Sequence, residues 1–542
     1  MLLSVRGLTV EADAGRGAVR ILDRVDLSLA RGRVLGIIGE SGAGKSTLGL
    51  VAMGFVRDGC RITGGAIQFD GVDLVRESEE RRRTIRGARI AYVAQSAIAA
   101  FNPAHRLIDQ SIEVAVQHGL RTRADAVRET VDLYRRFRLP SPESMGRRYP
   151  HQVSGGQLQR VMTAMAMIVK PDLVIFDEPT TALDVTTQIE VLAAIREAVE
   201  SIGTSAIYIS HDLALVAQMA DRIMVMRAGR VVEEGDTAQI LNQPQESYTR
   251  ALLSVRRRTP MARRTPAAAE VPLLSVKDVT AAYGATVALQ EVAIDIGPGS
   301  TVAVVGESGS GKSTLARVIT GLIPPRRGRI EFEGRVLSPR YDRRTKEDLR
   351  GIQMIVQTPD TALNPRLKVS DAIGRPLEFY FGLSGRVKER RLNELLEEIE
   401  LDPVEYGQRF PDELSGGQRQ RVCIARALAA APRLLICDEA TSALDQLVAG
   451  EILKLLDRLQ RERSLAYLFI THDLSTVRAI ADEVVVMRRG RVVDAGSRAR
   501  ILAPPYHPYT ELLLSSVPEM DPSWLDRVLQ ARGAASTETA AS

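Results

Sequence analysis

One glycine-rich stretch occurs twice in this chain, and the repetition limits the folds that the chain can adopt. The letters GESGAGKSTL run from Gly39 to Leu48, and GESGSGKSTL runs from Gly306 to Leu315. Three further segments recur in the same order, each 261 positions later: VSGGQLQR as LSGGQRQR, LVIFDEPTTALD as LLICDEATSALD, and YISHDL as FITHDL. Four ordered blocks at nearly one spacing indicate a tandem duplication of one domain.

The duplication predicts two domains joined by a linker, and a chain of 542 residues is long enough to bury more than one core. The segment RRRTPMARRTPAAAEVP between the repeats is polar and rich in Pro and Ala, which is typical of a flexible linker. We expect a first domain over residues 1–255, the linker over residues 256–272, a second domain over residues 273–517 and a largely disordered tail over residues 518–542.

The charge of the chain bears on its partners. The formal net charge is +5, and most of the 72 basic residues are Arg. A basic balance can favour nucleic acid or an anionic surface. Aromatic residues make up only 4% of the chain, and no run of Tyr or Phe lies between basic residues. We therefore expect basic side chains spread over solvated faces, and no nucleic-acid partner.

Cysteine usage and hydropathy bear on the compartment. The three cysteines, Cys60, Cys423 and Cys437, form no C-x-x-C pair, so we expect neither a zinc site nor an iron–sulfur cluster. The N-terminus lacks the charged and apolar regions of a signal peptide, and no apolar run reaches the ~18 residues of a membrane span. We expect a cytosolic protein whose role at a membrane, if any, needs a partner.

Short apolar runs alternate with amphipathic segments in each half. Arg33–Gly39 and Asp172–Glu178 are typical of buried strands. In Arg390–Glu400 the apolar residues fall on one face of a helix: Leu392, Leu395, Leu396 and Ile399. The alternation predicts an α/β fold with a largely parallel sheet covered by helices.

In both halves the pattern G-x-x-x-x-G-K-S follows a predicted strand and precedes a predicted helix, which is typical of a P-loop. Its backbone N–H groups can surround phosphate oxygens at the positive end of the helix. Lys45 and Lys312 are placed for the β- and γ-phosphates, and Ser46 and Ser313 for Mg²⁺. We assign nucleotide contacts to Gly39, Glu40, Ser41, Gly42, Ala43, Gly44, Lys45, Ser46 and Thr47, and to Gly306, Glu307, Ser308, Gly309, Ser310, Gly311, Lys312, Ser313 and Thr314.

A pair of carboxylates ends a predicted strand in each half. Asp177 and Asp438 each follow four apolar residues, so they emerge where a carboxylate can reach Mg²⁺ through water. The adjacent Glu178 and Glu439 suit a general base that polarises the attacking water. We therefore interpret the Asp residues as metal-binding and the Glu residues as catalytic.

A histidine closes a second apolar strand in each half. His211 and His472 each follow the aspartate at the same spacing, which a packed or capping histidine would not require. We expect each to contact the γ-phosphate or to orient the water and the glutamate.

The SGGQ segments form a second anion-binding element. Ser at a helix N-cap, followed by two glycines without side chains, leaves backbone N–H groups open to an anion. The sequence separation from the P-loop does not assign either segment to its own half. The candidate residues are Ser154, Gly155, Gly156 and Gln157, and Ser415, Gly416, Gly417 and Gln418.

Taken together, the P-loop, SGGQ, DE, ALD and HD motifs resemble the nucleotide-binding domain of ABC ATPases over almost the whole chain, twice. The resemblance implies a RecA-like, mostly parallel sheet core, an antiparallel β subdomain and a helical subdomain in each half. It implies ATP and Mg²⁺ as cofactors and head-to-tail pairing of the two domains within the chain. One site would then combine Gly39–Thr47 with Ser415–Gln418, and the other Gly306–Thr314 with Ser154–Gln157.

The resemblance assigns further positions. Gln95 and Gln357 match the Q-loop glutamine, which senses Mg²⁺ and couples to the transmembrane partner, and Asp184 and Asp445 match the D-loop aspartate.

Family members usually stack adenine on an aromatic residue just after the first strand. Tyr283 occupies that position, whereas the matching position in the first half is Ala12. We expect weaker nucleotide binding at the first site unless an Arg of the segment Gly15–Arg20 stacks on the base.

Three classes of ABC protein compete: a transporter motor, a paired translation factor, and a DNA-repair or chromosome ATPase. The last class carries long coiled coils or zinc cysteines, and this sequence has neither. Paired translation factors carry a long charged helical linker and typically DEPTNHLD, whereas this chain has a short Pro-containing linker and DEPTTALD. A transporter motor fits best, and a tandem ATPase acting on the ribosome or on nucleic acid is the alternative.

Finer resemblance points to the oligopeptide/dipeptide and nickel importer family. The segments QSAIAAFNPAHRL (Gln95–Leu107) and QTPDTALNPRLKV (Gln357–Val369) are similar to its Q-x-P-x-x-x-L-N-P stretch. QPQESYTRALL (Gln243–Leu253) and PPYHPYTELLL (Pro504–Leu514) resemble its C-terminal extension. Two departures are Ser96–Ala97 in place of the usual Asp-Pro, and Ala440 in place of the Pro of DEPT.

This finer resemblance implies partners and a location. We expect two transmembrane permease subunits and an extracytoplasmic solute-binding protein, with one chain per transporter at the cytoplasmic face of the inner membrane. Peptides are the default substrate, and nickel chelates, opines and sugars stay open. Asn102–Pro103 and Asn364–Pro365 are expected to lie where each half receives a permease helix.

Overall fold

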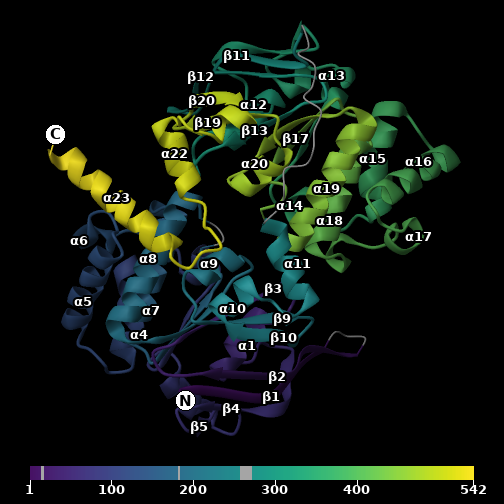
Figure 1. Ribbon diagram of the computed structural model, residues 1–542. Helices are drawn as coiled ribbons and strands as arrows, with labels where there is room; N and C mark the ends of the chain where they lie inside the picture. Colours follow the sequence, from purple (N-terminus) through teal and green to yellow (C-terminus); the bar gives the residue numbers. More distant parts are fainter. Residues whose placement is uncertain (14–16, 181–182, 257–270, 443, 542) are drawn as a thin grey trace. The chain divides into compact units, whose positions relative to one another are not determined.

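The computed structural model describes residues 1–13, 17–180, 183–256, 271–442 and 444–541. The chain divides into two units, of which the first contains Met1–Ser254 together with Ser515–Ser542 and the second contains Val255–Leu514. Residues 257–270 of the predicted linker lie outside the described residues. Figure 1 colours the chain from purple to yellow, and its last, yellow helix belongs to the first unit.

A six-stranded, mostly parallel sheet forms the centre of each unit. Only the last strand of each sheet, β10 or β20, runs antiparallel to its neighbour. In spatial order the first sheet contains β10 (Arg230–Asp236), β9 (Arg222–Arg227), β3 (Val34–Gly39), β8 (Ser205–Ile209), β7 (Leu173–Asp177) and β6 (Ile90–Val93). The second contains β16 (Ile352–Ile355), β17 (Leu434–Asp438), β18 (Ala466–Ile470), β13 (Thr301–Val305), β19 (Glu483–Arg488) and β20 (Arg491–Ser497).

An antiparallel four-stranded sheet packs on each central sheet, and its strands come before and after the strand that leads into the P-loop. The first is ordered β2 (Ala18–Leu29), β1 (Leu3–Asp13), β4 (Cys60–Phe69) and β5 (Val72–Asp73). The second is ordered β12 (Thr286–Ile296), β11 (Leu274–Tyr283), β14 (Arg327–Phe332) and β15 (Arg335–Val336). In each unit one apolar core joins residues of both sheets with the helix that follows the P-loop, which fixes the loop between them.

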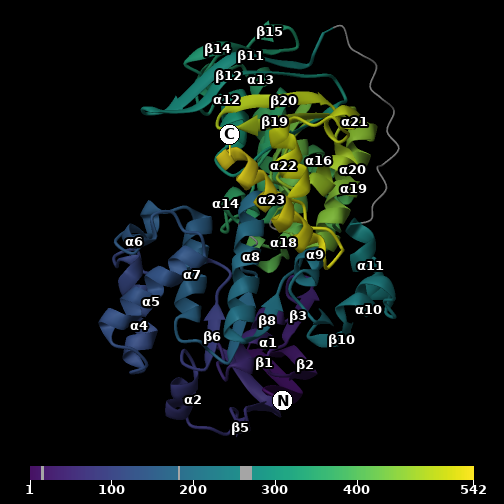
Figure 2. The same ribbon diagram turned by 60° about the vertical axis from the view of Figure 1, so that its left-hand side comes forward.

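Helices cover the central sheets and form a separate helical subdomain in each unit. In the first unit α4, α5 and α6 gather beside α7 (Figure 2). Besides the last helix of the chain, the helices of the first unit are α1 (Lys45–Ala52), α2 (Glu79–Ile85), α3 (Ala97–Ala100), α4 (Leu107–Gln117), α5 (Arg123–Arg136), α6 (Pro142–Met145), α7 (Gly155–Met167), α8 (Val185–Ile202), α9 (Leu213–Ala217), α10 (Thr237–Asn242) and α11 (Ser247–Arg256).

The second unit repeats this order of helices. They are α12 (Lys312–Ile319), α13 (Lys346–Gly351), α14 (Pro359–Ala362), α15 (Val369–Phe381), α16 (Gly385–Glu398), α17 (Pro403–Tyr406), α18 (Gly416–Leu428), α19 (Gln446–Arg463), α20 (Leu474–Ile480), α21 (Arg498–Ile501) and α22 (Pro508–Ser515). The predicted apolar face of α16 is buried, as is Ile399 at its end. The predicted α/β fold, with two subdomains beside each parallel core, is confirmed.

The end of the chain differs from its prediction. Residues 518–542 were expected to be largely disordered, but α23 (Trp524–Ala541) is a helix, and Trp524 and Leu525 are buried. The composition of the last residues suggested disorder because they are small and polar, whereas the segment before them carries the apolar side chains that pack on the first unit.

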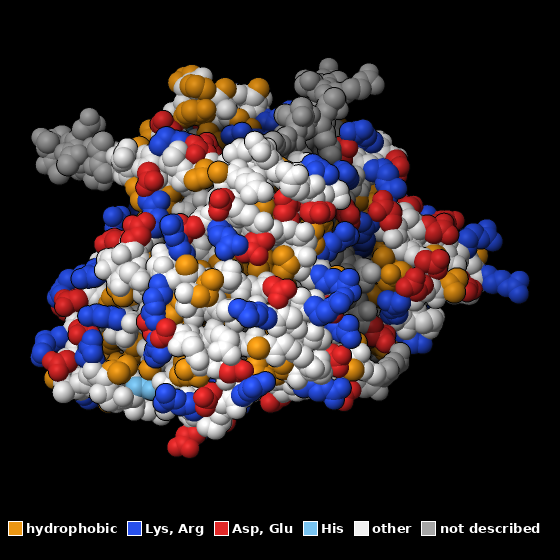
Figure 3. Space-filling view, turned by 60° about the horizontal axis from the view of Figure 1, so that its bottom comes forward, with side chains coloured by type: hydrophobic (Ala, Val, Ile, Leu, Met, Phe, Trp, Pro, Cys, Tyr) orange, Lys and Arg blue, Asp and Glu red, His pale blue; other side chains and the backbone are white. Residues whose placement is uncertain are grey.

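The distribution of charged side chains on the surface agrees with the small positive net charge of the chain. On the face shown in Figure 3, Lys and Arg side chains alternate with Asp and Glu side chains and do not gather into a patch of one sign. Within the described part of the chain, no helix has the length and apolarity that crossing a membrane would need.

Candidate functional site

The P-loop of each unit connects the central strand to the helix that starts at the predicted lysine. Gly39 ends β3 with a φ of 155°, and a Cβ there would lie 2.2 Å from the backbone oxygen of Met226, so only glycine fits. Gly306 is in the same situation. The Lys45 Nζ donates to the backbone oxygens of Gly39 and Glu40, both at 2.8 Å, which holds the ammonium inside the loop.

A serine hydroxyl and an aspartate carboxylate meet beside each loop. Ser46 Oγ donates to Asp177 Oδ1 at 2.9 Å, and Ser313 Oγ donates to Asp438 Oδ1 at 3.0 Å. Burial raises the pKa of both carboxyls, although the hydrogen bonds from the serines oppose this. Hard oxygen donors of these two kinds are what Mg²⁺ prefers, and a cation would favour the ionised carboxylate. The predicted metal-binding residues therefore fit the ion.

The neighbouring glutamate is held from two sides in each unit. In the first, Gln95 Nε2 donates to Glu178 Oε2 at 2.9 Å, and His211 Nδ1 lies 3.3 Å from Glu178 Oε1. In the second, the matching distances are 2.8 Å and 3.5 Å, from Gln357 and His472 to Glu439.

This glutamate also has an unusual backbone conformation, and its carboxylate shifts the pKa of the facing histidine. Glu178 and Glu439 adopt φ values of 49° and 51°, a strained conformation for a residue with a Cβ and one that recurs at functional sites. Burial would lower the pKa of His211 and His472, but the facing carboxylates outweigh it, so the pKa of both imidazoles is raised. The structure thus brings together the lysine, serine, aspartate, glutamate, glutamine and histidine predicted for each half.

Within the described residues, one contact distinguishes the site of the first unit from that of the second. Tyr92 Oη, on β6, donates to Asp177 Oδ2 at 2.6 Å. The same sheet position in the second unit is Met354, since Tyr92 pairs with Ile175 and Met354 with Ile436. The sequence analysis did not identify this tyrosine. A signal was available, because Tyr92 lies three residues before Gln95, whereas Met354 lies three residues before Gln357.

The SGGQ segments start helices, as predicted. Ser154 is the N-cap of α7, and its side chain accepts from the Gln157 N–H at 3.3 Å while Gln157 Oε1 accepts from the Ser154 N–H at 3.2 Å. Ser415 and Gln418 repeat this capping box on α18. A Cβ on Gly156 would lie 2.5 Å from the Thr187 side chain on α8, so the second glycine is needed for helix packing. The pairing of either segment with a P-loop stays a prediction.

The strand register supports the match between Tyr283 and Ala12. Leu3 pairs with Phe69 and Leu274 pairs with Phe332, and counting nine residues along each strand reaches Ala12 and Tyr283. Tyr283 ends β11 with 46% of its surface exposed, and its hydroxyl accepts from Arg317 at 3.3 Å. Residues 15 and 16 of the segment that is expected to supply a substitute Arg lie outside the described residues.

The C-terminal part of each unit reaches its own P-loop, which sequence reasoning did not foresee. The Glu40 N–H donates to Tyr248 Oη at 3.2 Å, and the Glu307 N–H donates to Tyr509 Oη at 3.3 Å. Burial raises the pKa of Tyr248 to about 12, so its hydroxyl stays neutral. These are the tyrosines of the SYT and PYT letters quoted for the C-terminal extensions, and the repeated letters were the available signal.

Comparison with known proteins agrees with this geometry. The family model described as "ABC transporter" matches residues 22–181 and 289–442, more than half of the chain. The chain belongs to the ABC transporter family. It is an ATP-hydrolysing member, because both units carry the nucleotide-binding motifs of that family. The model "Oligopeptide/dipeptide transporter, C-terminal region" matches residues 232–276 and 493–542 and so includes both P-loop-contacting tyrosines.

Curated relatives extend over nearly the whole chain. The glutathione import ATP-binding protein GsiA of Escherichia coli (strain K12) is 36% identical over 96% of this chain and 90% of its own length. The protein of the same name from Salmonella choleraesuis is 37% identical with the same coverage. The solved structure of cbiO1 from Clostridium perfringens is 29% identical and covers 43% of this chain and 92% of that chain, with a TM-score of 0.39.

Proposed function

We propose that this chain is the ATP-hydrolysing subunit of a membrane importer for peptides or similar small solutes, at the cytoplasmic face of the inner membrane. The observation that carries the proposal is that each unit joins a full set of nucleotide-binding and catalytic side chains to a C-terminal region of the oligopeptide/dipeptide transporter type. Relatives that cover 96% of the chain are named for glutathione import, and glutathione is a small peptide.

The chemistry at each site follows from the side chains present. Ser46 and Asp177 would hold Mg²⁺, which neutralises charge on the phosphates when bound. Lys45 adds positive charge at the phosphates. Glu178 would accept a proton from the attacking water, and its contacts with Gln95 and His211 support this role because they fix the direction of its carboxylate. The second unit repeats these roles at matching positions, so we propose hydrolysis at both sites, each completed by the SGGQ segment of the other half.

A groove on the second unit supports a docking place for a permease subunit. A cavity of about 730 Å³ lies beside β16 and α15, and Asn364 of the predicted docking segment is among its lining residues. Phe379, also in the lining, is 54% exposed, with Lys346 Nζ 4.9 Å from its ring centroid. An exposed aromatic ring next to charged groups suits a short amphipathic helix of a partner. The partners we propose are two permease subunits and an extracytoplasmic solute-binding protein.

The test is to isolate the tagged full chain from detergent-solubilised membranes and to identify the proteins that accompany it. The expected result is a pair of multi-spanning permease subunits, lost in a Phe379→Asp variant. The matched control is Tyr341→Asp, because Tyr341 is an aromatic residue of the same unit with 51% exposure that does not line the groove. Ribosomal proteins in place of permeases would favour the alternative, a tandem ATPase acting on the ribosome, and would overturn the proposal.

A further inference from the structure

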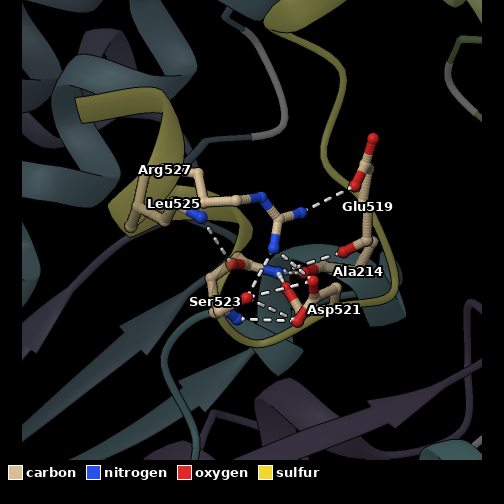
Figure 4. Close-up of polar contacts among 7 residues, drawn as sticks. Ala214, Glu519, Asp521, Ser523, Leu525 and Arg527 are labelled. Carbon is tan, nitrogen blue, oxygen red and sulfur yellow. Dashed lines mark hydrogen bonds and ion pairs between the residues drawn. The ribbon is translucent and has the colours of Figure 1, made fainter. Parts of the chain in front are cut away.

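The C-terminal segment Glu519–Arg532 packs on two helices of the first unit, α8 and the end of α9, which come much earlier in the sequence. Trp524 is 3% exposed and Leu525 is fully buried, and α23 contacts α8. Figure 4 shows the yellow segment folding over the end of α9 with its polar groups directed at one another. The chain therefore leaves the first unit at Ser254 and returns to it after Leu514.

Gln218, at the C-terminal end of α9, is the centre of this contact and is only 5% exposed. Its Nε2 lies 3.0 Å from the backbone oxygen of Glu519 and 2.9 Å from that of Asp521, and its Oε1 accepts from the Leu525 N–H at 3.1 Å. Leu525 lies in the first turn of α23, where backbone N–H groups have no partner within the helix. One buried side chain thus fixes the turn before α23 and caps that helix.

Charged groups complete the contact. Arg196 on α8 forms an ion pair with Asp526 of α23. Within the segment, Arg527 pairs with Glu519 at 3.0 Å and with Asp521, whose carboxylate also accepts from the Ser523 N–H at 2.9 Å. The turn that Gln218 binds is therefore already shaped by contacts of its own, which reduces the entropy lost on docking.

The second unit does not carry the same receptor. The helices α8 and α19 match residue for residue, as do the segments that contain α9 and α20. At the positions of Arg196 and Gln218 the second unit has Asp457 and Ala479. An aspartate would repel Asp526, and an alanine can make none of the three amide hydrogen bonds. After the duplication, only the first copy has the groups that receive this segment.

We propose that the first unit has a docking site for the C-terminus of its own chain and that this site keeps the two ATP-binding domains together when no nucleotide is bound. The linker provides one connection between the units, and the docked segment provides a second. The two helices that receive the segment also carry residues of the ATP site at their N-terminal ends. The D-loop aspartate Asp184 caps α8, and α9 starts directly after His211 and Asp212.

The test distinguishes the connection made by the linker from the connection made by the docked C-terminal segment. A sequence-specific protease site is placed within residues 257–270 of the full chain, the linker is cut, and the halves are separated by size in EDTA without nucleotide. The halves should elute together when the C-terminal segment is intact. Gln218→Ala should raise their dissociation constant about tenfold or more, since it removes the acceptor of the Leu525 N–H and the amide that donates to the Glu519 carbonyl, whereas the Asp521 carbonyl still accepts from the Trp524 N–H. The control is Gln530→Ala, an exposed glutamine on the same helix, which should change nothing.

Exchanging the charges of the ion pair between Arg196 and Asp526 provides a second measurement. These changes do not leave the empty space that Gln218→Ala creates in the contact. Arg196→Asp and Asp526→Arg should each weaken the association of the cut halves, and the double variant should restore it. Intact cut halves that separate completely without nucleotide, or a Gln218→Ala chain that stays together as well as the parent, would overturn the proposal. Neither result depends on import or on a permease, so the proposed function would be unaffected.

Discussion

Replacing Tyr283 by alanine should weaken nucleotide binding at the site built on Lys312 and leave the site built on Lys45 unchanged. Tyr283 is 46% exposed at the end of β11, so one face of its ring is free to stack on adenine. Covering roughly 50–100 Å² of that ring at about 25 cal/mol per Å² gives about 1–2.5 kcal/mol. This lies within the roughly 1–3 kcal/mol found for base stacking, and it corresponds to about 5- to 70-fold in affinity.

The assay is titration of each site with a fluorescent ATP analogue while the other site is disabled by Lys45→Ala or Lys312→Ala. Tyr283→Phe should keep the affinity, because the ring stacks, and within the described residues the hydrogen bond of the hydroxyl is to Arg317. Ala12→Tyr should strengthen the first site, whose matching position lacks a ring. Equal affinities of the two sites in the parent chain, or an unchanged affinity in Tyr283→Ala, would refute the reasoning.

Three further changes test other contacts at the sites. Tyr248→Phe leaves a P-loop N–H without its acceptor and should lower the free energy of unfolding of the first unit by about 1–3 kcal/mol, measured by urea denaturation with the second unit as internal reference. Tyr92→Phe should cost about 1.5–3 kcal/mol in the same assay, because a hydrogen bond to the carboxylate of Asp177 is lost. Glu178 raises the pKa of His211. The stabilisation from this pair is therefore complete below the ordinary histidine pKa and disappears as the pH rises through the raised pKa. His211→Gln should reduce the dependence of the free energy of unfolding on pH near neutrality.

Much of this molecule can be predicted from its sequence because the chemistry is local. A P-loop needs its glycines, lysine and serine next to one another, and a strand of four apolar residues carries its terminal aspartate to a known edge of the sheet. The structure accordingly places Ser46 against Asp177, as the motifs indicated, and adds a hydrogen bond from Gln95 to Glu178. Duplication strengthens each inference, because the same motif occurs twice in the same context.

The contacts that were missed join residues that no motif connects. Tyr248 and Glu40 lie 208 positions apart, and Gln218 and Leu525 lie 307 positions apart. No periodicity links such residues, because their contact depends on how complete units fold. Disorder was predicted for the tail from its last residues, although Trp524 and Leu525 before them are large apolar side chains that are seldom left in water.

The measurement that tests the account most directly is ATP turnover of the purified full chain carrying Glu178→Gln or Glu439→Gln separately. Each variant keeps the lysine, serine and aspartate that hold the nucleotide, so ATP should still bind. Each also loses a group that accepts the proton of the attacking water, a contribution of about 10²–10⁴-fold at that site. Turnover that falls to about half or less, with ATP retained, is the predicted result for both variants, because the other site still carries its glutamate. A variant of either glutamate that hydrolyses ATP at the parent rate would contradict hydrolysis at two equivalent sites.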